Sequence, residues 1–353
     1  MTSFRIDILV IGAGPAGTSA ARAAAGKGLT VICADRRAEI GVPVQCAEFV
    51  PMPLLRSVHE TDSRVQDVEG MLTVLPSGLR HRRVFPGMMI DRARFDQGLA
   101  ELAQAAGARV ETRCQFLDWD GEVARLRRGT DEALALRPRL LIGADGPHSL
   151  VAEAVGLPRQ QVVYTRQYTV PLLRPYADTD IFLSDAFPGG YGWLFPRGPV
   201  ANLGLGTDRR FEGNLKLPLE QLHRQVLERG LVGAAILGRT GGAIPVGGIR
   251  PMVHGNVVLA GDAAGLTHPI TGAGIPAAVI SGERAGAAAA DYLAGDMGAL
   301  ESYAEDMRDQ FGPTLARAMQ RRKALEAVWR QPAAREDRVM RSGWIAFDEY
   351  FAA

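Results

Sequence analysis

The chain has 353 residues, of which 47% are hydrophobic and 22% charged, so it is long enough for two interleaved globular domains. A net charge of +1 argues against nucleic acid as a partner, and no apolar run approaches the ~20 residues that span a bilayer, so we expect at most peripheral membrane contact. Three scattered cysteines (Cys33, Cys46, Cys114) exclude a disulfide framework and a C-x-x-C zinc site, so we expect no metal and a reducing, cytoplasmic compartment.

The first 35 residues have the pattern of strand, tight turn, helix and strand. A short apolar run at residues 6–11 predicts a buried parallel strand, and an alanine-rich helix and a second strand ending at Asp35 follow it. Gly12, Gly14 and Gly17 fit G-x-G-x-x-G at the turn, where the helix start offers free N–H groups to a pyrophosphate. Asp35 is placed to accept from ribose hydroxyls. The sequence therefore predicts a dinucleotide site here.

Charged and thiol side chains follow this unit. Arg36 and Arg37 can pair with phosphate or stack on adenine, or they form a solvated charge pair. The proline-rich loop at residues 41–51 contains Cys46 and Glu48. Without further context, Cys46 is more often an inert thiol than a reactive one.

The next segment contains mostly β structure. Residues 71–84 predict a hairpin, and a helix capped by Asp91 is expected to end near Ala106. In residues 109–136, polar and apolar residues alternate as they do in β-strands. A further apolar strand then delivers Asp145 to its carboxyl end, which is where open α/β sheets bind ligands.

From residue 161 to 207 the pattern becomes antiparallel, which predicts a second sheet inserted between parts of the first domain. Tyr191, Trp193 and Phe195 alternate there and so share one face. An aromatic stripe of this kind is usually core. The glycines beside it leave room around the rings, which favours a pocket for a flat ligand or an acyl chain as much as it favours core.

Three features complete the chain. Residues 217–237 are expected to be helical, and a third strand ends in Gly261 and Asp262 before an alanine-rich helix at residues 275–293. The last 50 residues predict an amphipathic helix and an aromatic terminus, which either contacts a second protein or packs down on its own chain.

These elements predict an α/β protein with a Rossmann-type domain, an interleaved antiparallel-sheet domain and a C-terminal helical segment. We expect the Rossmann-type domain to comprise residues 1–75, 85–160 and 250–295, and the inserted domain residues 76–84 and 161–249. The helical segment then spans residues 296–353.

Residues 4–295 resemble the FAD-dependent oxidoreductases built like para-hydroxybenzoate hydroxylase, and within them the geranylgeranyl reductase family. The resemblance rests on the glycine fingerprint and on motifs around Cys46-Ala-Glu48, Gly143-Ala-Asp145-Gly146, Tyr191-x-Trp193-x-Phe195-Pro196 and Gly261-Asp262 through Gly274-Ile275.

The resemblance implies bound FAD, with NAD(P)H as a transient reductant because no second glycine fingerprint is present. The residues implied in holding FAD are Gly12, Ala13, Gly14, Pro15, Ala16, Gly17, Asp35, Arg36, Arg37, Cys46, Arg92, Asp145, Gly261, Asp262, Gly272, Ala273, Gly274 and Ile275. Those implied in the substrate pocket are Tyr191, Trp193, Phe195 and Pro196. The resemblance also places Cys46 near this pocket, and the candidate catalytic residues are Cys46, Glu48 and His268.

The chain departs from the family pattern in three places. It is shorter toward its C-terminal side, which argues against a long isoprenoid tunnel. His268-Pro269 stands where Asn-Pro is common, and Cys46-Ala-Glu48 where Cys-Gly-Glu is usual.

Three functions are compatible with these motifs. The first is a reductase that delivers hydride from reduced FAD to an alkene of a prenyl, lipid or quinone substrate. The second is a monooxygenase that hydroxylates an aromatic ring, including a Trp or Tyr side chain of a partner protein, with His268 or Glu48 moving protons near the ring. The third is a flavin-binding assembly factor without an activity of its own.

Overall fold

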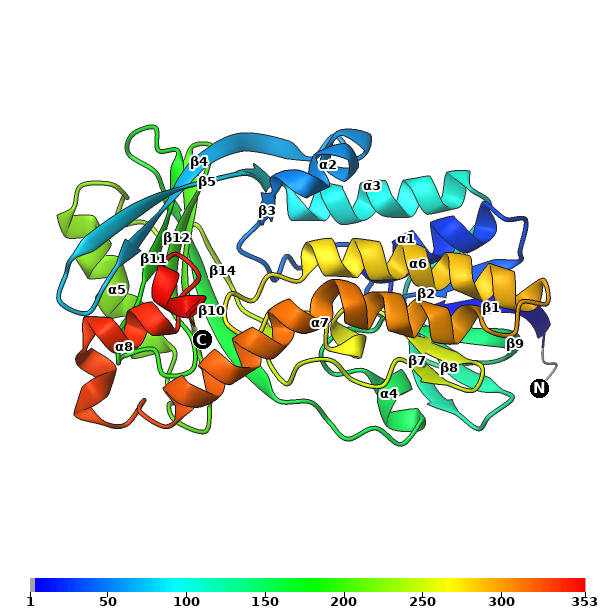
Figure 1. Ribbon diagram of the computed structural model, residues 1–353. Coiled ribbons are helices and arrows are strands. Elements are labelled where there is room, and N and C mark those ends of the chain that lie inside the picture. The colour runs from blue at the N-terminus through cyan, green and yellow to red at the C-terminus, as the bar shows by residue number, and fades with distance from the viewer. Residues whose placement is uncertain (1–3, 353) are drawn as a thin grey trace.

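The computed structural model describes residues 4–352, and their strands form two sheets that lie side by side (Figure 1). Sheet A contains the N-terminal strand, and sheet B contains the aromatic stripe. The N-terminus lies at the far end of sheet A, whereas the C-terminus lies beside sheet B. The expected α/β class with two sheets is confirmed.

Sheet A is an open and mainly parallel sheet. Its strands are β1 (Phe4–Ile11), β2 (Val31–Ala34), β6 (Arg109–Glu111), β7 (Cys114–Trp119), β8 (Ala124–Arg128), β9 (Glu132–Gly143), β16 (Val253–His254) and β17 (Val257–Leu259). The parallel core has the order β17-β9-β1-β2-β6, so the carboxyl ends of β1, β2, β9 and β17 meet at one edge. That edge is where such sheets bind ligands.

Four helices form a layer beside sheet A, with α1 (Pro15–Ala25) packed between α3 (Arg92–Ala105) and α6 (Ile275–Leu293). The 28-residue α7 (Ala299–Glu326) packs on α6 and runs on toward sheet B (Figure 1). Asp91 caps α3 as expected, since its carboxylate accepts from the N–H of Arg94 at 3.0 Å. The short α2 (Leu55–Glu60) and α4 (Leu150–Ala154) lie in connecting segments. No helix within residues 4–352 is long and apolar enough to cross a bilayer.

Sheet B is mainly antiparallel. Its strands are β3 (Phe49–Pro51), β4 (Arg64–Val74), β5 (Arg80–Ile90), β10 (Val162–Pro171), β11 (Asp178–Phe182), β12 (Gly192–Arg197), β13 (Val200–Thr207), β14 (Gly238–Thr240) and β15 (Ala243–Pro245). One face packs on α5 (Lys216–Glu228) through Leu219, Leu222 and Val226. The opposite face carries the predicted aromatic stripe on β12.

The sheets divide the chain differently from the expected domain boundaries. The predicted hairpin is longer than residues 71–84: β4 and β5 pair from Arg64 to Ile90, and both belong to sheet B. The short β3 in the cysteine loop also joins sheet B, through β5. The sequence does not show this because charged residues and two register shifts interrupt the strand pattern of residues 64–70, and Pro86 and Gly87 interrupt that of residues 85–90.

The C-terminal aromatic residues pack down on their own chain. After α7, α8 (Asp337–Ser342) and a short 3-10 turn place Trp344, Phe347 and Tyr350 in buried positions, each only 2% exposed. Trp344 and Phe347 join Trp193 and Phe195 in one apolar cluster. Of the terminal aromatic residues, only Phe351 is exposed, at 52%.

Candidate functional site

A cavity of about 1170 Å³ is lined by the carboxyl-end loops of β1, β2 and β9, by the starts of α1 and α6, and by the aromatic face of sheet B. It therefore brings together segments that are far apart in the sequence. The predicted site residues that line it are Gly12, Gly14, Pro15, Ala16, Asp35, Arg36, Arg37, Cys46, Glu48, Arg92, Asp145, Tyr191, Trp193, Phe195, Asp262, Gly272, Ala273, Gly274 and Ile275. Ala13, Gly17, Pro196, Gly261 and His268 were predicted but do not line it.

The three glycines of the fingerprint have different physical roles. Gly12 has a φ of +98°, and a Cβ there would lie 2.3 Å from the carbonyl oxygen of Ala144. A Cβ on Gly17 would lie 1.7 Å from the carbonyl oxygen of Gly12, so Gly17 serves the packing of α1 rather than the cavity lining. A Cβ on Gly14 would meet only open space, and Gly14 lines the cavity. The open side of the turn therefore forms a cradle in front of the N-terminus of α1.

Asp35 is held in a fixed orientation at the end of β2. Its carboxylate accepts from the N–H of Ala13 at 2.8 Å and from the N–H of Arg37 at 2.7 Å. A carboxylate has about four lone-pair sites, so roughly two remain for hydroxyl groups of a ligand. Arg36 is exposed, and Arg37 donates to Gln45 at 3.0 Å, so neither guanidinium is paired with an acid among residues 4–352.

A second helix N-terminus faces the same cavity. Gly274 precedes α6 without any side-chain cap, and Gly272 has a φ of +69°, so backbone N–H groups and the positive end of the helix dipole face the cavity. Asp262 lies beside this turn and accepts a hydrogen bond from the hydroxyl of Thr267. Burial raises the pKa of Asp262.

Asp145 and Gly261, two of the predicted cofactor residues, make their contacts within the protein. The carboxylate of Asp145 accepts from the hydroxyl of Ser149 at 2.5 Å and from the N–H of Leu150 at 2.7 Å, so it stabilises the start of α4. Gly261 lies against α1, where a Cβ would approach the Cβ of Ala16 to 2.9 Å. Asp145 therefore lines the cavity with its carboxylate already bonded, and Gly261 lies behind the cavity wall.

Glu48 lines the cavity, but its carboxylate is fully engaged. It accepts from the N–H of Arg92 at 3.0 Å and from the side-chain amide of Asn202 at 2.8 Å, and it pairs with Arg197 at 3.0 Å. Burial raises the pKa of this carboxyl group. These bonds hold the cysteine loop on sheet B and do not fit the expected role in proton transfer.

His268 does not fit the expected role in proton transfer either. It lies behind the cavity wall, where its Nδ1 accepts from the N–H groups of Ile270 at 3.3 Å and Thr271 at 3.2 Å. Burial lowers the pKa of His268 to about 4, so the ring is neutral near pH 7. The ring orders the turn that leads into α6.

Cys46 is the remaining predicted catalytic side chain, and it lines the cavity half-buried. Its Sγ accepts from the N–H of Glu48 at 3.2 Å. Arg92 lies beside it and is paired with Asp96 at 2.7 Å. Burial opposes the charge of Arg92, but Asp96 and Cys46 raise its pKa, so a fixed positive charge stands next to the thiol.

The aromatic stripe forms the roof of the apolar part of the cavity. Tyr191 donates to the carbonyl oxygen of Thr271 at 2.6 Å, and Trp193 donates to the side chain of Gln167 at 3.0 Å. Pro196 is buried but falls on the other face of β12, as the alternation of a strand requires. The same part of the cavity is also lined by residues not predicted for it, namely Phe49, Met71, Phe85, Ile181, Trp344 and Ile345.

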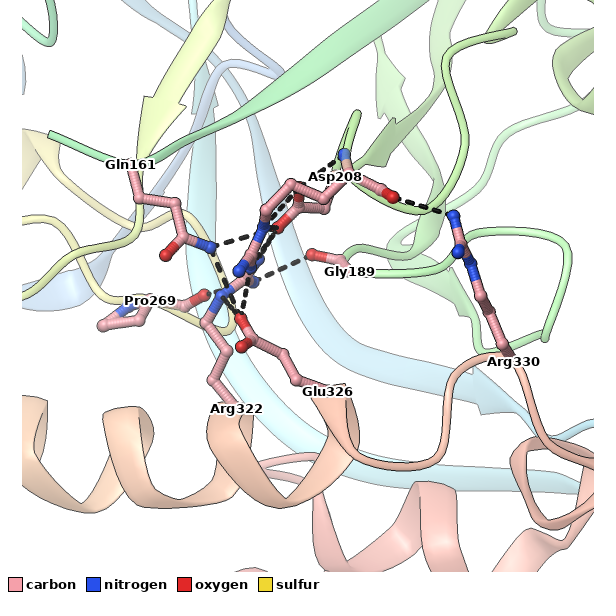
Figure 2. Close-up of polar contacts among 8 residues, drawn as sticks. Gln161, Gly189, Asp208, Pro269, Arg322, Glu326 and Arg330 are labelled. Carbon is pink, nitrogen blue, oxygen red and sulfur yellow. Dashed lines mark hydrogen bonds and ion pairs between the residues drawn. The ribbon is translucent and has the colours of Figure 1, made fainter.

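Arg322 on α7 is a further residue without a sequence signal (Figure 2). It is 3% exposed, and it donates to the carbonyl oxygens of Gly189 at 2.9 Å and Pro269 at 3.3 Å. It also pairs with Asp208 at 3.0 Å. One guanidinium thereby joins α7 to the loop before the aromatic stripe and to the loop before α6.

Comparison with known proteins agrees with this geometry. A family model described as FAD binding domain matches residues 52–174, and one described as lycopene cyclase protein matches residues 214–349. A digeranylgeranylglycerophospholipid reductase of Methanocella arvoryzae is 34% identical over 336 residues, which cover 88% of this chain and 84% of that protein. Digeranylgeranylglycerophospholipid reductase 1 of Methanopyrus kandleri is 35% identical and covers 87% of each chain.

Solved structures show the same fold. A geranylgeranyl bacteriochlorophyll reductase-like protein from Thermoplasma acidophilum superposes with a TM-score of 0.85 at 26% identity, covering 97% of this chain and 92% of that one. A myxobacterial chondrochloren halogenase has a TM-score of 0.73 at 18% identity, covering 94% and 86%.

The fold and the cavity define an FAD-dependent oxidoreductase. Within that class, the chain belongs to the geranylgeranyl reductase family.

Proposed function

We propose that this protein reduces carbon–carbon double bonds in the prenyl chains of a membrane lipid, with a digeranylgeranylglycerophospholipid as the substrate class. The observation that carries the proposal is the continuity of one cavity. Its lining includes the N-termini of α1 and α6, the carboxylates of Asp35 and Asp262, and the apolar aromatic face of sheet B. The relatives at 34% and 35% identity carry the name of a reductase for such a lipid.

The polar part of the cavity fits FAD. The cradle at Gly14 has room for phosphate groups in front of α1, and Asp35 keeps lone pairs for ribose hydroxyls. The start of α6 at Gly274 would stabilise negative charge on a reduced ring through its dipole. When bound, FAD supplies the hydride for the reaction.

The protein itself would contribute a dry pocket and a proton. The side chains Met71, Phe85 and Ile181 carry no charge and, with the aromatic roof, exclude water from a double bond held beneath it. Reduction of one double bond takes a hydride to one carbon and a proton to the other. Cys46 faces the cavity with an S–H group, and we assign the proton to it.

The test is an anaerobic incubation of FAD-loaded protein and NAD(P)H with a digeranylgeranyl phospholipid, followed by mass spectrometry of the lipid. We expect the lipid to gain the mass of two hydrogen atoms for every double bond reduced. An unchanged lipid in the presence of reduced flavin would contradict the proposal.

Trp193→Ala is the matched variant. We expect it to retain FAD, because Trp193 belongs to β12 and to neither helix N-terminus, and to reduce the lipid at least about tenfold more slowly. If flavin content and lipid reduction both stayed at the level of the unaltered protein, Trp193 would be a residue of the hydrophobic core without a role in substrate binding.

The monooxygenase alternative has less support from the site. It needs a group that moves protons near the ring, and His268 and Glu48 are both engaged elsewhere. The halogenase likeness is below 25% identity and concerns the fold alone. Incorporation of isotopically labelled dioxygen into an aromatic substrate or partner protein would decide for this alternative.

A further inference from the structure

Four cationic side chains line the cavity from the face of sheet B that packs on α5, opposite to the face that carries the aromatic stripe. We call them the cationic cluster, and they are Arg166, Arg209, Lys216 and Arg239. Neither the fingerprint nor the aromatic stripe accounts for them.

The strand register shows why they gather. Arg239 on β14 pairs with Tyr168 on β10, so it shares a face of sheet B with Arg166, two residues before Tyr168. Tyr164 falls on that face too, and the guanidinium of Arg209 lies 3.7 Å from the centre of its ring. Lys216 begins α5, which packs over the same face.

The cluster lacks acidic partners. Within residues 4–352, none of its arginines forms an ion pair with a carboxylate, and Lys216 has only Glu220 at 3.7 Å, one turn along α5. No Asp or Glu lies among the cavity-lining residues between 164 and 244. Several like charges on one wall repel each other unless an anion joins them. The cavity wall is therefore built to receive negative charge.

We propose that the cationic cluster is a binding subsite for a phosphate ester of a ligand that enters the cavity. Arginine presents paired N–H donors that match phosphate oxygens, and a tyrosine-stacked guanidinium such as that of Arg209 is held in place to do so. The phosphate belongs either to the headgroup of a phospholipid or to a nicotinamide dinucleotide. The phospholipid source rests on the proposed function, whereas the dinucleotide source needs only a flavin that is reduced by NAD(P)H.

The test compares the FAD-loaded protein with the neutral double variant Arg166→Gln/Arg239→Gln. The control is Arg224→Gln, because Arg224 is an exposed arginine on α5 that does not line the cavity. Binding is measured by titration calorimetry for NADPH, for NADH, for a prenyl phospholipid, and for the matching glycerol ether that lacks the phosphate headgroup.

We expect the double variant to lose about tenfold or more in affinity for phosphate-bearing ligands and the control to lose none. A loss for the phospholipid without a loss for the headgroup-free ether identifies the lipid phosphate. A loss for the dinucleotides identifies the reductant. The subsite would be overturned if the affinity for all four ligands were unchanged. It would also be overturned if the phospholipid and the headgroup-free ether lost affinity equally and the dinucleotides lost none.

This outcome is separable from the proposed function. Binding is measured without turnover, so an arginine-dependent affinity for the dinucleotides supports the subsite even if no lipid is ever reduced. Conversely, reduction of the lipid with unchanged affinities in the double variant supports the reductase and removes the subsite.

Discussion

Two acidic residues in the cavity wall, Glu48 and Asp262, differ in how many partners they have. Glu48 is bound by three groups that come from α3, β12 and β13. Asp262 has one partner, the hydroxyl of Thr267, five residues away. A carboxylate with free lone pairs next to a helix N-terminus is suited to hold a ligand hydroxyl, whereas a saturated one is suited to hold a loop.

We therefore expect Asp262→Ala to bind FAD about tenfold or more weakly, because a hydrogen bond to a charged group is lost. Flavin absorbance per protein after gel filtration measures the occupancy. Asp306→Ala, which alters an exposed acid on α7, is the control and should retain full occupancy. Equal flavin content in both variants would remove Asp262 from the cofactor site.

His268 predicts a pH dependence of stability. Its pKa is about 4 in the folded chain against 6.5 for the free side chain, so the unfolded state binds more protons between these values. Stability contributed by neutral His268 is therefore present above about pH 6.5 and is lost as the pH falls toward 4.

His268→Asn keeps an acceptor for the turn and removes this titration. Between pH 7 and pH 5, the unaltered protein should lose about 2 kcal/mol of unfolding free energy more than the variant. Urea unfolding at both pH values measures the difference. Parallel losses in the two proteins would show that His268 does not titrate in this range.

At the scale of elements, α7 links loops of the two sheets, and Arg322 makes the largest number of these contacts. Arg322 binds the loop before β12 and the loop before α6, so the position of the aromatic stripe relative to the start of α6 depends on it (Figure 2). Next to Arg322, Glu326 on α7 pairs with Arg210 at 2.7 Å. Burial lowers the pKa of Arg322, and the neighbouring carboxylates offset this.

Arg322→Met should destabilise the protein by about 3 kcal/mol, because Gly189, Pro269 and Asp208 lose a buried donor. It should also weaken FAD binding, since the turn at Pro269 leads into α6. Thermal unfolding and flavin titration measure the two effects, and the exposed Arg308→Met on α7 is the control. Unaltered FAD affinity in a destabilised Arg322→Met protein would limit Arg322 to a structural role.

The features that the sequence could predict are local ones. Gly12, Gly14 and Gly17 lie within one turn, and the alternation of Tyr191, Trp193 and Phe195 lies within one strand, so spacing alone places them. The role of Glu48 depends on a distant partner, because Asn202 is 154 residues away. The ring of His268 also has a distant neighbour, the hydroxyl of Tyr350, 82 residues away and 3.4 Å from its Nε2. Nothing in the spacing of residues shows such partners before the chain is folded.

At the scale of the whole molecule, the C-terminal segment completes the pocket that an N-terminal fingerprint begins. Trp344 lines the cavity, and its ring lies 4.8 Å from that of Tyr191. The segment that contains Trp344 and Ile345 therefore closes the apolar part of the site.

Trp344→Leu should bind a prenyl lipid at least about fivefold more weakly and FAD with unchanged affinity, because the residue contacts only the apolar part of the cavity. Lipid titration of the FAD-loaded protein measures this. Phe351→Leu, at an exposed aromatic residue, is the control. If both variants bound lipid equally well, Trp344 would not contact the lipid, and the terminal segment would only cover sheet B.

The interleaving of the two sheets also bears on how the protein is made. Sheet A receives β17 only near residue 257, and sheet B is covered by Trp344 and Phe347 close to the C-terminus. A nascent chain on the ribosome therefore leaves sheet A without β17 until residue 257 is made, and it leaves sheet B without its apolar cover until residues 344–347 are made. Its early strands must wait for late ones, which makes folding dependent on non-local pairing and exposes the growing chain to aggregation.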